Sequence, residues 1–224
     1  MGEVNKDLLK YIETEILPIY ENNDSGHGIN HIKYVLNRCL MFSKQFSDID
    51  INMIYTIAVF HDIGHYIDKD NHEKISADIF YKDERMKDFF DEEKRMIIKE
   101  AIEDHRASLE YEPRSIYGKI ISSADRTTQI ESILMRTHSY SKKHYSNLST
   151  MQLIDRAFRH MKSKYGNNGY AKNYCIDKDF EMFKKEVSRL LNDKWEFSKR
   201  YMDMMIMLLL RGIYMMLLKI LSIQ

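Results

Sequence analysis

An adjacent histidine and aspartate, His61 and Asp62, follow the apolar stretch 51–60. An imidazole and a carboxylate are both metal ligands, and a cation lying between the directions of two neighbouring helical side chains can bind both. Gly64, two residues later, is expected to let the backbone turn sharply at a helix end. Taken alone, the dipeptide is explained as well by chance, so a metal site is predicted only if other ligands accompany it.

Other ligand types lie upstream and downstream of this pair. His27 and His31 are four residues apart, so a helix would place them on one face, with Asp24 or Ser25 as its N-cap. Of the two histidines, His31 is the predicted ligand and His27 is expected to line or support the site. Asp125 emerges from an apolar helical face, where a buried carboxylate needs a partner such as a cation.

This ordered set resembles the HD-domain metal-dependent phosphohydrolases, which have a histidine on one helix, a His-Asp pair on the next and an aspartate on a later helix. The match covers residues 20–130, and the residues that match are His31, His61, Asp62 and Asp125. The resemblance implies an all-helical domain in which these side chains hold a divalent cation and leave positions open for water and phosphate oxygen. The implied cofactor is Mn, Fe, Co, Ni, Zn or Mg, as one ion or two.

Further polar residues of the same region are candidates for the rest of the site. Some superfamily members hold a second metal through extra histidines, and the candidates here are His65, His72 and His105, of which the last two could instead contact substrate or simply lie nearby. Asp62, His65 and Asp68 are the predicted catalytic residues, and of these His65 and Asp68 are the candidate acid–base groups for an attacking water. Four basic residues are the predicted phosphate contacts, although each alone is more simply a solvated surface charge: Arg106, Arg114, Lys119 and Arg126.

The elements that position these residues are predicted to be helices. Apolar residues recur at helical spacing, period-2 alternation is not convincing anywhere, and two prolines and eight glycines are few for 224 residues. The predicted fold class is therefore all-α, an HD-domain-like helical bundle with a C-terminal helical extension. Helices are predicted over 8–16 (ending before Pro18), 31–46, 51–62, 91–105 (with Met96 on its apolar face), 116–130, 153–161 and 180–191, and loops over 21–28, 68–71, 139–149 and 166–173.

Composition limits the function classes and the compartment. The 34 basic and 34 acidic residues give zero formal net charge, which argues against a general nucleic-acid binder. The two cysteines are far apart and form no CxxC, so cysteine zinc sites and a disulfide framework are not expected. The N-terminus lacks the apolar core of a signal peptide, and we expect a cytoplasmic protein.

The C-terminal stretch is apolar, in contrast to the polar segment before it. Residues 204–223 have the length of a bilayer span, but Arg211 near the middle would cost on the order of a few kcal/mol there. We favour a helix that packs on the domain or drives homo-oligomerisation over one that contacts a membrane. The predicted organisation is an HD-type domain over 1–200 and an apolar helix or tail over 201–224.

The leading functional hypothesis is a metal-dependent phosphohydrolase acting on a small phosphorylated metabolite, most simply a nucleoside tri- or monophosphate. One alternative is a phosphodiesterase of a signalling nucleotide, but the Gly-Tyr-Pro element that follows the His-Asp pair in the two-metal signalling phosphodiesterases is absent here. The other alternative is a non-catalytic, metal-stabilised helical interaction module. The intact set of histidines and carboxylates argues against it, because a structural site does not need open coordination positions.

Overall fold

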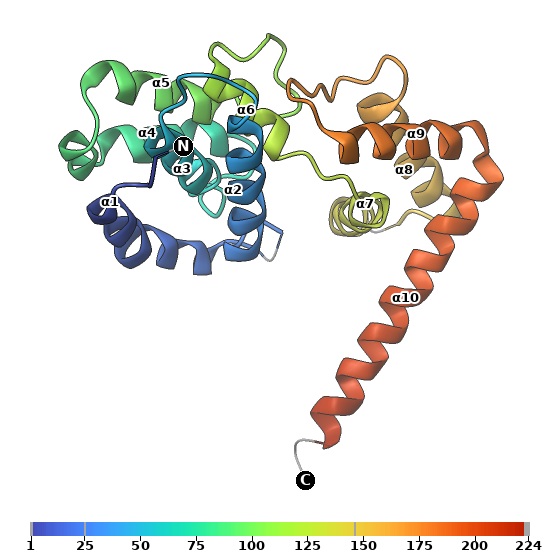
Figure 1. The fold of residues 1–224 in the computed structure, drawn as a ribbon. Helices are drawn as coiled ribbons and strands as arrows, with labels where there is room; N and C mark the ends of the chain where they lie inside the picture. Colours follow the sequence, from blue (N-terminus) through green and yellow to red (C-terminus); the bar gives the residue numbers. More distant parts are fainter. Residues whose placement is uncertain (1, 25, 146, 222–224) are drawn as a thin grey trace. The chain divides into compact units, whose positions relative to one another are not determined.

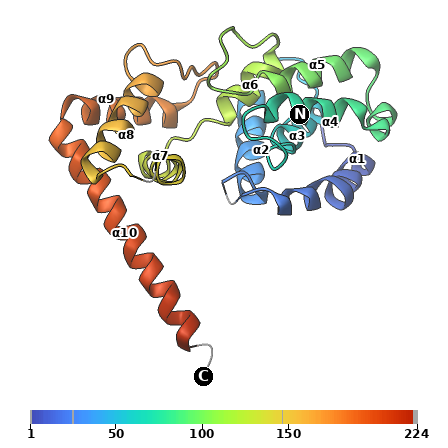
Figure 2. The same cartoon turned by 180° about the vertical axis from the view of Figure 1, so that it is seen from behind.

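The computed structural model describes residues 2–24, 26–145 and 147–221, with side chains in the last helix described as far as Tyr214. All regular structure in these ranges is helical, which confirms the predicted all-α class (Figures 1 and 2). The chain divides into two compact units. Unit 1 comprises Met1–Arg126 and Lys172–Asp177, and unit 2 comprises Thr127–Ala171 and Lys178–Gln224. The predicted boundary at residue 200 falls inside the last helix, α10 (Lys194–Leu221).

Unit 1 contains the residues with predicted metal chemistry. Its elements are α1 (Lys6–Tyr11), the π-helical turn η1 (Ile12–Ile16), the 3-10 turn η2 (Leu17–Asn22), α2 (Ile29–Ser43), α3 (Ile51–Phe60), α4 (His72–Lys82), the 3-10 turn η3 (Glu84–Asp88), α5 (Glu92–Glu103) and α6 (Ile116–Ala124).

Helix α3 is the centre of unit 1. It contacts α2, α4, α5 and α6, and every residue except Asn52 is buried. The side chain of Asp50 caps its first turn by accepting from the Asn52 N–H at 3.0 Å. At the other end, the buried Tyr20 hydroxyl donates to the Val59 carbonyl oxygen, one of the carbonyls that a helix terminus leaves without an internal partner. A ten-residue helix without a charged side chain thus carries His61 and Asp62 into the interior.

The described part of unit 2 consists of four helices and their connections. They are α7 (Ile130–His144), α8 (Thr150–Tyr165), α9 (Lys178–Asn192) and α10 (Lys194–Leu221). A capping box begins α8. The Ser149 hydroxyl accepts a hydrogen bond from the backbone N–H of Gln152, and the Gln152 side chain accepts one from the backbone N–H of Ser149. Helix α10 contacts α7, α8 and α9. None of the described helices is long and apolar enough to cross a membrane, and residues 222–223 of the predicted candidate span lie outside the described ranges.

The first predicted boundary agrees with the structure and several others were wrong. The π-helical turn η1 ends at Ile16, before Pro18, and the chain continues as the 3-10 turn Leu17–Asn22, in whose first turn the missing N–H of Pro18 costs no hydrogen bond. Helix α6 ends at Ala124 instead of continuing to residue 130, and α7 runs to His144 through part of the loop predicted over 139–149. Helix α4 lies in a stretch for which no helix was predicted. Met96 of α5 is exposed, whereas it was expected on the apolar face.

The turn before α2 and the one after α3 also differ from expectation. Helix α2 starts at Ile29 with Gly28 as its N-cap, so His27 precedes the helix and Asp24 does not cap it; Ser25 lies outside the described residues. Gly64 does not have a positive φ. Its role is spatial, because a Cβ atom there would lie 2.6 Å from Ile75 Cγ2 and 2.9 Å from the Ser76 nitrogen on α4.

Candidate metal centre

Three histidines of unit 1 are oriented by the same type of hydrogen bond to a backbone carbonyl oxygen. The Nδ1 atoms of His61, His72 and His105 lie 2.9, 2.9 and 2.7 Å from the carbonyl oxygens of Ala58, Lys69 and Ile102, in each case the residue three positions earlier. A carbonyl oxygen can only accept, so each Nδ1 is the protonated donor. The Nε2 atom of each ring is thereby left with a lone pair for a cation, as is typical of metal-binding histidines.

The Asp62 carboxylate lies between two pairs of imidazoles, formed by these three rings and that of His31. Its Oδ2 atom is 3.3 Å from Nε2 of both His31 and His61. Its Oδ1 atom is 3.3 Å from His72 Nε2 and 3.5 Å from His105 Nε2. Two candidate ligand groups therefore share Asp62: His31, His61 and Asp62 on one side, and Asp62, His72 and His105 on the other. Asp24, His27 and His65 form a third group.

Asp125 completes the first group. It follows α6 directly, and its Oδ1 atom lies 3.2 Å from His31 Nε2 and 4.0 Å from His61 Nε2. The four residues predicted to hold the first ion thus come from α2, the end of α3 and the end of α6. These elements are far apart in the sequence and pack against one another in the fold.

The donor atoms fit a cation. Two ligands bound to one tetrahedral ion at about 2.1 Å are separated by roughly 3.4 Å, which is close to the separations of 3.2–3.3 Å from His31 to the two aspartates. The Nε2 atoms of His31 and His61 are buried and have no hydrogen-bond partner among the described residues. Buried polar atoms are rarely left unpaired. A shared cation would satisfy both.

The electrostatics of the cluster keep the carboxylates ionised. Burial raises the pKa of Asp62, but His61, His105 and His31 outweigh it and hold that pKa well below its usual range. Burial also opposes ionisation of Asp125, and His31 lowers its pKa in turn. Burial lowers the pKa of His31, whereas Asp125 and Asp62 raise it, to about 9. Without metal, protonated His31 balances the aspartates at neutral pH.

His65 lies beside this cluster in a different environment. Its ring stacks on that of His27 at a centroid separation of 3.7 Å and lies 5.2 Å from the ring of His72. Burial and the neighbouring His27 lower its pKa to about 4, so the imidazole is neutral at pH 7. Its Nδ1 atom is buried and has no hydrogen-bond partner within the described ranges.

Sequence reasoning missed the residues that hold His27 in place. Asp24 Oδ1 is 2.8 Å from His27 Nδ1, and Asp24 Oδ2 accepts from Lys69 Nζ at 2.6 Å. The Asn23 amide donates to the carbonyl oxygens of His27 and Asp62, at 2.9 and 3.0 Å. A short polar residue just after a helix is typical of turns, but the sequence does not show which distant carbonyl such a residue reaches.

The structure does not bring Asp68 into the cluster. Its two carboxylate oxygens accept from the Asp70 N–H at 2.9 Å and from the Asn71 amide at 2.8 Å, and thereby close the turn before α4.

The predicted phosphate contacts are engaged with protein groups. Arg106 contacts Glu73 at 3.0 Å, Arg114 contacts Asp104 at 2.8 Å, and Lys119 contacts Glu112 at 2.6 Å. Arg126 is buried and donates to the carbonyl oxygen of the candidate ligand His105 at 3.2 Å and to Ser122 Oγ at 2.7 Å. Asp104, for which no role was predicted, is fully buried and accepts hydrogen bonds from the backbone N–H and the guanidinium of Arg114.

Comparisons with known proteins bear on this centre. The family model of the HD domain matches residues 28–130, which include the four residues of the predicted first ion site. A crystal structure of a predicted HD superfamily hydrolase from an uncultured Thermotogales bacterium is similar to this chain at 21% sequence identity, with a TM-score of 0.43, and the alignment covers 69% of this chain and 93% of that one. No curated protein matches the chain. The family match confirms the resemblance stated from the sequence and supports a metal-dependent phosphohydrolase in general.

Proposed function

Residues 28–130 form an HD domain, and from that premise we propose that this chain hydrolyses a small phosphorylated metabolite, a nucleoside tri- or monophosphate, with divalent metal as cofactor. The observation that carries the proposal is the position of Asp62. One carboxylate, fully ionised, has a pair of histidine Nε2 atoms beside each of its oxygens. A site that only tied helices together would not need a carboxylate shared between two ligand groups.

In this proposal Asp62 would hold one ion together with His31, His61 and Asp125, and a second ion together with His72 and His105. Cations held there would supply the activation of water and the neutralisation of charge on phosphoryl oxygens.

The protein side chains have separate tasks. His65 is neutral at pH 7 and buried beside His72, so it can accept a proton from the attacking water. Asp24 accepts from His27 Nδ1–H and so fixes the ring on which His65 stacks. Arg126 holds the backbone of His105 and therefore positions that ligand.

Arg106 is the basic residue we propose as a phosphate contact. Its guanidinium bonds Glu73, the residue after His72, and one third of its side chain is exposed. An incoming phosphate can replace the Glu73 carboxylate, because a guanidinium binds both anions with the same planar geometry. Arg114 and Lys119 would have to leave Asp104 and Glu112 to do the same.

Hydrolysis of a nucleotide panel tests the proposal. Protein loaded with Mn²⁺ is assayed for phosphate and pyrophosphate release from nucleoside tri- and monophosphates, beside Asp62→Ala and the matched control Asp78→Ala, an exposed carboxylate on α4. We expect Asp62→Ala to lose turnover by about 100-fold or more and to lose bound metal, because its carboxylate contacts both ligand groups. Asp78→Ala should behave like wild type.

Other outcomes separate the competing functions. Full turnover by Asp62→Ala would refute the assigned site. Metal bound by wild type and lost in Asp62→Ala, without hydrolysis of any nucleotide, would favour the metal-stabilised interaction module. Cleavage of cyclic or linear dinucleotides alone would favour the phosphodiesterase.

A further inference from the structure

Residues 201–214 of α10, called here its outer half, expose many large apolar side chains. Among residues 201–214 the exposed large apolar side chains are Met202, Ile206, Met207, Leu209, Leu210, Ile213 and Tyr214. Met207 and Leu210, which line the groove described below, are 68% and 55% exposed. Within unit 2 this helix continues well past α8 and α9 (Figure 1). Contiguous apolar surface of this kind marks an interaction site.

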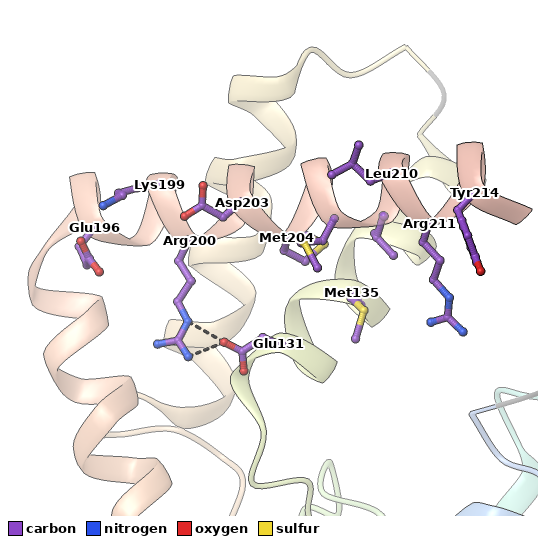
Figure 3. Close-up of a pocket in the computed structure, with 12 residues that line it drawn as sticks. Glu131, Met135, Glu196, Lys199, Arg200, Asp203, Met204, Leu210, Arg211 and Tyr214 are labelled. Atoms are coloured by element: carbon purple, nitrogen blue, oxygen red, sulfur yellow. Dashed lines mark hydrogen bonds and ion pairs between the residues drawn. The ribbon is translucent and has the colours of Figure 1, made fainter.

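One face of this segment forms a groove with α7. The groove has a volume of about 950 Å³ and is lined by Glu131 and Met135 of α7 and by α10 residues from Glu196 to Tyr214 (Figure 3). At its inner end Arg200 is neutralised, because its guanidinium contacts Glu131 and Glu186. Glu196 and Lys199 also line this inner end, and two further charged residues line the groove wall further along α10.

Two opposite charges, Asp203 and Arg211, lie on that wall. They are the only charged residues between 201 and 214, and neither has an ion-pair partner in the part of the chain that the structure describes. Residues 203, 207 and 211 follow one another at intervals of four, so they share one face of a helix with Met207 midway between the charges.

This spacing is self-complementary only in one orientation. If two copies of α10 lie antiparallel about a two-fold axis at Met207, Asp203 of each copy is opposite Arg211 of the other, at both ends of the contact. In the same register Met204 is opposite Leu210. A parallel pair would instead place Asp203 opposite Asp203 and Arg211 opposite Arg211, which is repulsive.

We propose that the α10 face containing Asp203, Met207 and Arg211 is a homodimer interface, occupied by the same face of a second copy in antiparallel orientation. The dimer buries the groove's methionine and leucine side chains and pairs two charges that have no ion-pair partner among the described residues of one chain. An anionic lipid surface would satisfy Arg211 alone and would leave Asp203 facing negative charge.

Charge exchange in the full-length protein tests the interface. Sedimentation velocity should show a wild-type dimer. Asp203→Arg and Arg211→Asp, each alone, place like charges opposite one another at both ends, so the dissociation constant should rise by about tenfold or more. A mixture of the two single variants should form heterodimers with affinity close to wild type, because every opposed pair is then complementary. Leu209→Asp is the matched control, since that residue points to the opposite side of α10 and its dimer should persist.

Three results would overturn the proposal. The first is a monomeric wild-type chain, including one that co-sediments with phosphatidylcholine–phosphatidylglycerol vesicles as a monomer. The second is a dimer indifferent to both charge changes, which would mean another face or a parallel arrangement. The third is failure of the mixed variants to associate while circular dichroism shows wild-type helix content in each, because unfolding is then excluded as the cause.

Discussion

Helix α3 and the outer half of α10 have similar apolar composition and opposite surroundings. All of α3 except Asn52 is buried by the helices around it. In α10, by contrast, no residue from 205 to 214 is fully buried, although only one of them is charged. The difference shows that an apolar sequence favours burial, but that the neighbouring elements determine whether its side chains are covered within the chain.

The same contrast applies to charge. Unit 1 places ionised Asp62 at the end of its most apolar helix, where an unpaired charge would be prohibitive. Protonated His31, whose Nε2 atom lies 3.3 Å from Asp62 Oδ2, compensates it in the metal-free site. In α10 the charges of Asp203 and Arg211 lie in solvent-exposed surroundings and need no such compensation within the chain. Because Asp62 is buried, its charge requires close partners such as histidines or a cation. Because Asp203 and Arg211 are exposed, their charges are available to influence association with a second copy of the chain.

Truncating one apolar side chain in each helix should produce the largest difference in the free energy of unfolding between α3 and α10. Ile57→Ala in α3 should lower the free energy of unfolding by about 2–5 kcal/mol, because Ile57 is 1% exposed and its removal leaves a cavity. Leu209→Ala in α10 should change it by less than about 0.5 kcal/mol, since 65% of that side chain is already in water. Urea denaturation followed by circular dichroism measures both. Equal losses would mean that Leu209 is covered in solution.

The contrast between these helices also explains what the sequence could predict. The all-α class, α3 and the resemblance carried by His31, His61 and Asp125 depend on local periodicity and ordered motifs, which a single chain displays. The organisation of α10 could not be predicted, because apolar content does not show which neighbour covers a face. The groups that bind three of the four basic residues were also hidden, since Glu73, Asp104 and Glu112 are brought to them by packing or by the course of a loop.

The glycines of the two regions offer a second, smaller test. Gly64→Ala should destabilise unit 1 by about 1–3 kcal/mol, because the new methyl group would overlap Ile75 and the backbone of Ser76. Gly212→Ala in α10 meets nothing within 4 Å and replaces a poor helix former, so the helix should gain up to about 1 kcal/mol. Amide hydrogen exchange reports each effect locally. Slower exchange around residue 64 in Gly64→Ala would contradict the close approach of α4.

The smallest expected effect is the release of a proton from His31, one of the buried charged groups, when metal binds. Asp125 and Asp62 raise the pKa of His31 to about 9 against the opposing effect of burial, so the metal-free site holds a proton there at pH 7. A cation can bind only neutral His31, and therefore loading at pH 7 should release about one proton from this residue. The apparent affinity for metal should rise with pH, by up to about tenfold per unit, and flatten above pH 9.

The metal-free protein should respond to pH in the opposite direction. The stabilisation from protonated His31 is fully present below its ordinary pKa of 6.5 and is lost as the pH rises through about 9, so metal-free stability should fall over that interval. Calorimetric titration with Mn²⁺ in buffers of different ionisation enthalpy counts the released protons, with pH 9 as the control at which the release from His31 is roughly halved. A binding enthalpy at pH 7 that does not depend on the buffer would show that His31 is already neutral. The pairing of that imidazole with both aspartates would then be absent in solution.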